Sequence, residues 1–169
     1  MAGAIARGLE RGGQPPPDRC PVADGGEGTM ATLLAALGGE TQGATVHDPL
    51  GRLVPAGFAL VEDGGTAIVE VAEASGLGRV GEHERDAEAA STAGTGELIA
   101  AAVRTGAHVI LVAAGGSATT DGGAGAIEAI RAAGGLGDAQ LVVLCDVRTP
   151  FEDAARVFAP QKGADRRRA

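Results

Sequence analysis

Apolar residues follow two alternating spacings along the chain, one helical and one typical of strands. Between residues 30 and 37 the large apolar side chains recur at i, i+3, i+4 and i+7, which predicts a helix ended by Gly38 and Gly39. Between residues 53 and 71 the period falls to two, and the sequence E-D-G-G at 62–65 predicts a hairpin turn. The same spacing rules predict further helices over 4–9, 94–106, 124–133 and 151–158, and a short strand over 19–23.

Two short runs are apolar without interruption. Residues 108–114 read H-V-I-L-V-A-A and residues 141–145 read L-V-V-L-C. Such runs are typical of strands buried on both faces of a parallel sheet. Helices that alternate with buried strands predict an α/β fold in which at least part of the sheet is parallel. The central hairpin indicates an inserted or second subdomain.

Composition narrows the class of protein. The chain has 169 residues, enough to bury a core, and 29 of them are glycine without any three-residue period, which excludes collagen. Hydrophobic residues make up 44% and charged residues 21%, which excludes a disordered chain. Trp and Tyr are absent, so we expect a core built from Ala, Leu, Val and Ile.

Charge, hydropathy and cysteine spacing argue against several kinds of partner and location. A net charge of −8 and an aromatic content of only 2%, which leaves few side chains for base stacking, argue against nucleic acid as a partner. The longest strongly apolar stretch, 109–114, is too short to span a bilayer, and the first residues do not read as a signal peptide. The two cysteines form no CxxC motif. We therefore expect a reduced cytoplasmic protein with no membrane partner.

A five-residue pattern, D-G-G-x-G, occurs twice, at Asp24–Gly28 and at Asp121–Gly125, each time just before a predicted helix. A helix start offers unpaired N–H groups and partial positive charge, and glycines let those groups approach an anion closely. An aspartate there can hold Mg²⁺ or accept a proton from a hydroxyl. The alternative is that Asp24 and Asp121 are helix caps followed by glycine turns.

The segment between the 108–114 strand and Asp121 favours a ligand site. It reads G-G-S-A-T-T over Gly115–Thr120 and so carries two glycines and three hydroxyls. It follows a buried strand at its carboxyl end, where open α/β sheets place their ligands. We therefore predict that Gly115, Gly116, Ser117 and Thr119 bind an anion.

Two further residues are candidates on weaker grounds. Lys162 is the only lysine of the chain and can serve as a compact charge on a phosphate, or it can be a solvated surface residue. Asp146 ends the 141–145 strand, where a carboxylate either meets a ligand or metal or acts as a cap. The loose dinucleotide pattern G-x-G-x-x-A over 26–31, with Asp48 further along, leaves an NAD(P)-dependent oxidoreductase as an alternative.

Several stretches along the chain together form a recognisable pattern. They are P-V-A-D-G-G-E-G-T (21–29), D-P-L-G-R (48–52), E-A-S-G-L (73–77), G-T-G-E-L-I (94–99), G-G-S-A-T-T-D-G-G-A-G (115–125), C-D-V (145–147) and P-Q-K-G-A (160–164). In this order they resemble the bacterial glycerate kinase family, of the glycerate 2-kinase type. The chain begins after the strand that opens members of this family, and it lacks a segment that they carry between Gly135 and Gln140, so we expect an incomplete member.

The resemblance implies phosphorylation of D-glycerate with ATP and Mg²⁺. It implies that Asp121 orients or deprotonates the attacking hydroxyl and that Lys162 faces the phosphates. Asp24 and Asp146 would hold Mg²⁺, although the roles of Asp24 and Asp121 are interchangeable at this point. Substrate carboxylate or phosphate would be bound by Gly25, Gly26, Gly28, Gly115, Gly116, Ser117 and Thr119.

The resemblance also implies two α/β domains with the site between them. A discontinuous Rossmann- or flavodoxin-like domain would comprise residues 1–50 and 140–169, and a smaller domain would comprise residues 51–139 and carry the G-G-S-A-T-T-D-G-G-A-G loop. A catalytically inactive remnant that at most binds ligand is the alternative for a chain with missing segments.

Overall fold

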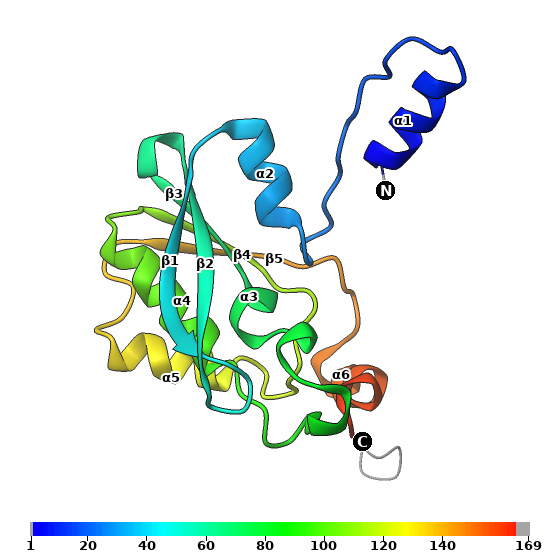
Figure 1. Cartoon of the computed structure of the whole chain (residues 1–169). Coiled ribbons are helices and arrows are strands. Elements are labelled where there is room, and N and C mark those ends of the chain that lie inside the picture. The colour runs from blue at the N-terminus through cyan, green and yellow to red at the C-terminus, as the bar shows by residue number, and fades with distance from the viewer. Residues whose placement is uncertain (1, 165–169) are drawn as a thin grey trace.

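The structure is a computed structural model that describes residues 2–164 (Figure 1). Every helix predicted from apolar spacing is present, and the hairpin and the 108–114 strand are confirmed. Short 3₁₀ turns lie at Glu62–Gly64, Leu77–Arg79, Glu82–Glu84 and Ala159–Lys162. The elements are α1 (Ala2–Arg11), α2 (Thr29–Leu37), β1 (Glu40–His47), β2 (Leu53–Val61), β3 (Thr66–Glu70), α3 (Val71–Ser75), α4 (Ala93–Arg104), β4 (Val109–Ala113), α5 (Ala124–Ala132), β5 (Gln140–Leu144) and α6 (Phe151–Phe158).

The five strands form one mixed sheet in the order β1-β2-β3-β4-β5. β1, β2 and β3 pair antiparallel, whereas β3, β4 and β5 run parallel, which confirms the predicted α/β class and the parallel part of the sheet. The central hairpin is therefore continuous with the parallel strands. The division into residues 1–50 with 140–169 and residues 51–139 stays a prediction.

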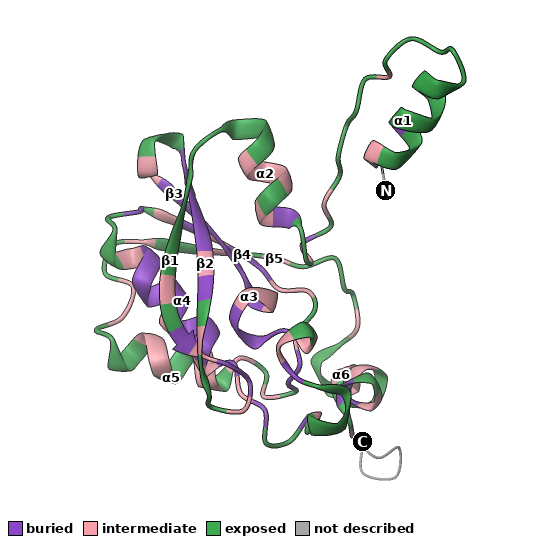
Figure 2. Ribbon diagram, in the orientation of Figure 1, coloured by how far each residue is buried: buried purple, intermediate pink, exposed green. Residues whose placement is uncertain are grey.

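Period-two alternation in β2 explains how the sheet is covered on both faces. Phe58 and Leu60 pack with residues of α4 in the larger of the two hydrophobic cores, and α5 packs against α4. Ala59 and Val61 point to the other face, where α2 covers them with its apolar stripe. Figure 2 shows the buried residues concentrated in β2, β3, β4 and the adjoining face of α4. This packing fixes the carboxyl ends of β3 and β4.

β5 differs from its prediction. The 141–145 run was expected to be buried on both faces, but Leu141 is 37% exposed and Val143 is 56% exposed. β5 is an edge strand with β4 as its only strand neighbour, and the space beside it is a cavity. An apolar run thus predicts a strand correctly without fixing how many neighbours cover it.

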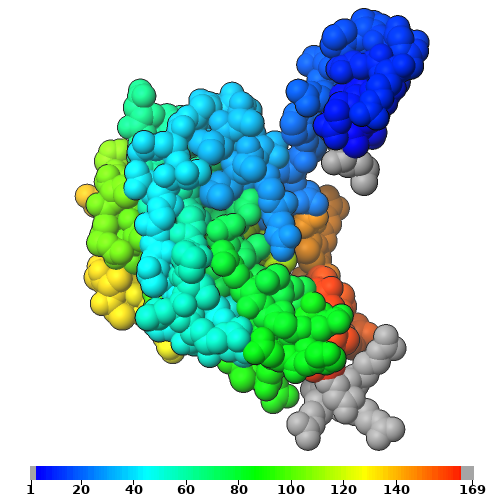
Figure 3. Space-filling model, in the orientation of Figure 1, coloured from blue at the N-terminus to red at the C-terminus, as the bar shows by residue number. Residues whose placement is uncertain are grey.

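The predicted strand over 19–23 is wrong, because these residues form an extended segment without sheet pairing. A proline run at 15–17 and Pro21 remove N–H donors along this stretch, which disfavours ladder formation. The segment connects α1, which stands off from the sheet, to the loop before α2 (Figures 1 and 3). Within residues 2–164, no helix is both long and apolar enough to cross a bilayer.

Candidate functional site

The two glycine-rich loops meet at the carboxyl ends of β4 and β5. The N–H of Gly115 donates to the carbonyl of Gly25 at 2.9 Å, and the N–H of Ala114 donates to the carbonyl of Leu144 at 3.1 Å. A Cβ on Gly115 would lie 2.6 Å from the Cα of Gly26, so this approach requires glycine. The segment 24–28 and the loop that follows β4 therefore lie side by side, at the end of the sheet where α/β folds bind ligands.

Asp121 is a partly buried carboxylate that ties together the starts of α4 and α5. It accepts hydrogen bonds from the N–H and the hydroxyl of Thr92, both at 2.8 Å, and from the N–H groups of Gly123 at 3.0 Å and Gly125 at 3.2 Å. Burial raises the pKa of the carboxyl, but the bonds from Thr92, Gly123 and Gly125 outweigh burial and hold its pKa below the usual value. Asp121 is therefore ionised at neutral pH.

Lys162 is buried, which contradicts the alternative of a solvated surface lysine. Its Nζ donates to the hydroxyl of Ser117 at 2.7 Å and to the carbonyl of Thr119 at 2.6 Å. Burial lowers the pKa of the ammonium, and the negative charge of Asp121 partly offsets this lowering. Because an ammonium has three N–H donors, two bonds leave the third available to an anion.

Lys162, Asp121, Ser117 and Thr119 lie at the polar end of one cavity of about 690 Å³. This volume lies within the range of small-molecule sites. Thr92, Thr95, Thr120 and Glu152 add further polar groups to the wall. Its apolar part comes mainly from β4, β5, α5 and α6, with one residue each from α3 and α4. The apolar lining includes Val71, Ile99, Val112, Ile127, Ile130, Leu141, Val143, Phe151 and Phe158.

The structure does not bring Asp24 and Asp146 into this cavity. Both side chains are exposed, and among the described residues Asp24 accepts a single hydrogen bond, from the N–H of Gly26 at 3.2 Å within its own loop. Across residues 2–164 no three His, Cys, Asp or Glu side chains are arranged to hold a metal ion. Mg²⁺ takes one or two protein carboxylates and fills its remaining positions with water and phosphate, so exposed aspartates at the sheet end fit that demand.

Two residues that hold the elements around the site in place were not found from the sequence. Thr92 binds Asp121 through both its N–H and its hydroxyl, and its hydroxyl also accepts the N–H of Ala126 at 2.9 Å. Glu70 is buried at the end of β3 and accepts the N–H of Met30 at 2.7 Å, which anchors the first turn of α2. A threonine just before a helical stripe is a capping signal and would have drawn attention to Thr92. Nothing local marks Glu70, whose partner lies 40 residues away.

Comparison with known proteins gives consistent matches. The sequence model described as "Glycerate kinase family" matches residues 1–134. Glycerate 2-kinase of Escherichia coli is 41% identical over an alignment 175 residues long, gaps included. The alignment covers 85% of this chain and 46% of that protein. Glycerate kinase of Bacillus subtilis is 41% identical over 177 residues, with 86% and 46% covered. A crystal structure described as glycerate kinase 2 from Salmonella typhimurium LT2 superposes with a TM-score of 0.80 at 34% identity and covers 96% of this chain and 53% of that one.

The match covers only part of each related protein. The chain spans about half the length of the curated relatives it matches. The structural match covers 96% of this chain, whereas the family model ends at residue 134, before β5 and Lys162.

Proposed function

Because the chain belongs to the glycerate kinase family, we propose that it phosphorylates D-glycerate with ATP at the cavity beside Lys162. The observation that carries this proposal is a buried ammonium aimed at the polar end of a cavity and held there by Ser117 and Thr119. Glycerate brings a carboxylate and hydroxyls, and ATP brings phosphates. Both are anionic ligands of the kind that a compact lysine charge binds.

Lys162 would bind either the substrate carboxylate or the transferring phosphate. A buried charge acts in a low dielectric, where its attraction for an anion exceeds that of an exposed one. Gly116 precedes Ser117 without a side chain, so its N–H group can approach the same anion, whereas the N–H of Gly115 already donates to Gly25. Phosphoryl transfer needs mainly positioning and charge neutralisation, and these residues supply both.

Asp121 would orient the attacking hydroxyl of glycerate. That hydroxyl oxygen forms a bond to the γ-phosphorus of ATP while the bond from this phosphorus to the oxygen that bridges it to the β-phosphorus breaks, so that ADP leaves and the hydroxyl proton passes to solvent water. A carboxylate with a lowered pKa is a weak base but a good hydrogen-bond acceptor. Orientation is therefore the role that its environment favours over proton abstraction.

ATP would supply the phosphoryl group, and Mg²⁺ would neutralise its phosphate charge. In this proposal Asp24 and Asp146 would hold the metal, and the N–H groups of Gly25 and Gly28 would face the phosphates, while the N–H of Gly26 donates to Asp24. The contact between Gly25 and Gly115 supports it, because it places the aspartate loop next to the loop that leads to Ser117.

The test is phosphorus NMR on the chain with D-glycerate and ATP–Mg²⁺. We expect a phosphate monoester signal that depends on glycerate, and Lys162→Met should lower kcat/KM by about 10- to 100-fold, as expected for a lost charged hydrogen bond. Arg104→Met, at the exposed end of α4, is the matched control.

Calorimetry distinguishes the alternatives. Binding of glycerate or ATP–Mg²⁺ without turnover would identify an inactive remnant that keeps only the ligand site. Binding of NAD(P) alone would favour an oxidoreductase. If neither glycerate nor ATP–Mg²⁺ binds, the proposal is wrong.

A further inference from the structure

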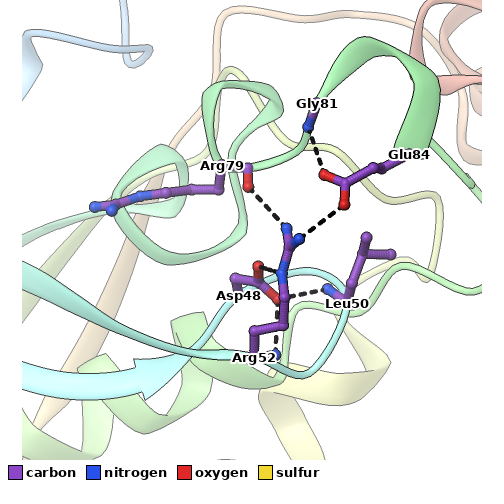
Figure 4. A network of polar contacts seen from close by, with 6 residues as sticks. All are labelled: Asp48, Leu50, Arg52, Arg79, Gly81 and Glu84. Atoms are coloured by element: carbon purple, nitrogen blue, oxygen red, sulfur yellow. Dashed lines mark hydrogen bonds and ion pairs between the residues drawn. The ribbon is translucent and has the colours of Figure 1, made fainter.

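The D-P-L-G-R motif forms the turn between β1 and β2 and is built around a buried carboxylate. Asp48 is 2% exposed and accepts the N–H groups of Leu50 and Arg52, both at 2.9 Å. It also pairs with the side chain of Arg52 through Nε at 2.5 Å (Figure 4). The turn thus fixes the direction in which the Arg52 guanidinium points.

From this turn, Arg52 reaches across to a segment that lies some thirty residues further along the chain. Its Nη1 donates to Glu84 Oε1 at 2.9 Å and its Nη2 donates to the carbonyl of Arg79 at 3.2 Å. The other carboxylate oxygen of Glu84 accepts the N–H of Gly81 at 3.1 Å. We call this set of contacts between Arg52 and residues 79–84 the Arg52–Glu84 clasp (Figure 4).

The residue after Glu84 touches the turn that carries Lys162. Arg85 Nη1 donates to the carbonyl of Gln161 at 3.5 Å, and a Cβ on Gly163 would collide with the carbonyl of Arg85. Arg85 Nε is buried and has no hydrogen-bond partner within residues 2–164. Apart from its bond to Gln161, Arg85 is therefore positioned by its neighbours in the chain, and the neighbour that the clasp holds is Glu84.

The same segment also supports the other partner of Lys162. The hydroxyl of Thr119 donates to the carbonyl of Ala90 at 2.6 Å, and the N–H of Ser91 donates to the carbonyl of Pro49 in the β1–β2 turn at 2.9 Å. The carbonyl of Thr119 in turn accepts Lys162 Nζ. Residues 85–91 thus connect the D-P-L-G-R motif to the Lys162 ammonium in two ways. One is the contact of Arg85 with Gln161, and the other is the hydrogen bond from Thr119 to Ala90.

We propose that Arg52 is a positioning residue, which acts through Glu84 and the 85–91 segment to hold the Lys162 ammonium at the end of the cavity. The proposal rests on the proposed function only for what Lys162 does, not for how it is held. Arg52 and Glu84 are both about half exposed, at 47% and 50%, and exposed ion pairs contribute little to global stability. Loss of the clasp should therefore change the site more than the fold.

The single lysine makes a direct test possible. Protein grown with 15N-lysine gives one side-chain ammonium signal, and its proton-exchange rate and chemical shift report how Lys162 is held. The variants are Glu84→Ala and Arg52→Gln. The matched control is Glu82→Ala, an exposed residue of the same 3₁₀ turn.

We expect Glu84→Ala and Arg52→Gln to raise the exchange rate of the Lys162 ammonium by about tenfold, with no change for Glu82→Ala. Glu84→Ala should keep a melting temperature close to that of the wild type, whereas Arg52→Gln also removes the charged partner of buried Asp48 and should unfold at a lower temperature. Glu84→Gln, which keeps an acceptor oxygen, should restore most of the protection. An unchanged ammonium signal in both clasp variants would overturn the proposal. Loss of cooperative unfolding in both would also overturn it, because the clasp would then serve the fold. Since no turnover is measured, these outcomes do not depend on whether the chain phosphorylates glycerate.

Discussion

The two D-G-G-x-G loops share their letters but not their surroundings. Asp24 is exposed and receives one hydrogen bond, from Gly26 within its own loop. Asp121 is partly buried and receives four, two of them from Thr92, which lies 29 residues earlier. The pattern specifies a glycine turn before a helix, whereas tertiary packing decides how many hydrogen bonds the aspartate receives from the rest of the protein.

The largest effect should come from removing the two carboxylates one at a time. Asp121→Ala leaves four donors without an acceptor and should lower the free energy of unfolding by about 3 kcal/mol. Asp24→Ala removes one exposed bond and should cost less than about 0.5 kcal/mol. Urea unfolding followed by circular dichroism measures both. Equal losses would mean that the environments of the two loops do not differ as the contacts indicate.

The sequence predicts most of the fold because the elements are amphipathic. The stripe at 30–37 and the alternation in 53–61 each specify one face, and α2 and β2 bury those faces as predicted. β1 was not predicted, since E-T-Q-G-A-T-V-H lacks alternation and most of its side chains are exposed at the sheet edge. The sequence therefore predicts an element where one face of it is buried and misses it where packing makes no such demand.

The candidate site is predicted in part. Lys162, Ser117, Thr119 and Asp121 were singled out, and the structure brings them to one cavity. Asp24 and Asp146 lie outside that cavity, and spacing in the sequence could not reveal this. Burial of Lys162 depends on long-range contacts with the loop after β4, so composition alone favoured a surface lysine.

The next largest effect on stability comes from the glycines. It compares the contact between the two loops, at Gly115, with the backbone turn inside one loop, at Gly28. Gly115→Ala places a methyl 2.6 Å from the Cα of Gly26, which is backbone and cannot rotate away, so we expect a loss of about 2–3 kcal/mol. Gly28→Ala meets no atom within 4 Å but must adopt φ +90°, which costs about 1 kcal/mol. The order of the two urea midpoints checks this. A more harmful Gly28→Ala would show that the loops are not in rigid contact.

Acid titration sharpens the difference between the aspartates through charge. The pKa of Asp121 in the folded state lies below its ordinary value of 3.8, so ionised Asp121 stabilises the fold above that value. This contribution is lost as pH falls through the folded-state pKa. Wild type should therefore lose more stability between about pH 5 and pH 2 than Asp121→Ala, while Asp48, whose pKa is also lowered, contributes to both proteins alike. Parallel acid profiles would show that the four hydrogen bonds do not favour the charged form.

The smallest effect is expected at alkaline pH, from Lys162. Burial lowers the pKa of its ammonium below 10.5 in the folded state, so the unfolded chain binds more protons between the folded-state pKa and 10.5. Stability should rise with pH across that interval and level off above it. The chain has no tyrosine, and both cysteines are exposed, so few other groups titrate there. Lys162→Met should abolish the rise in melting temperature. If the rise in melting temperature persists in Lys162→Met, it comes from another group. The Lys162 ammonium would then be solvated like that of an ordinary surface lysine.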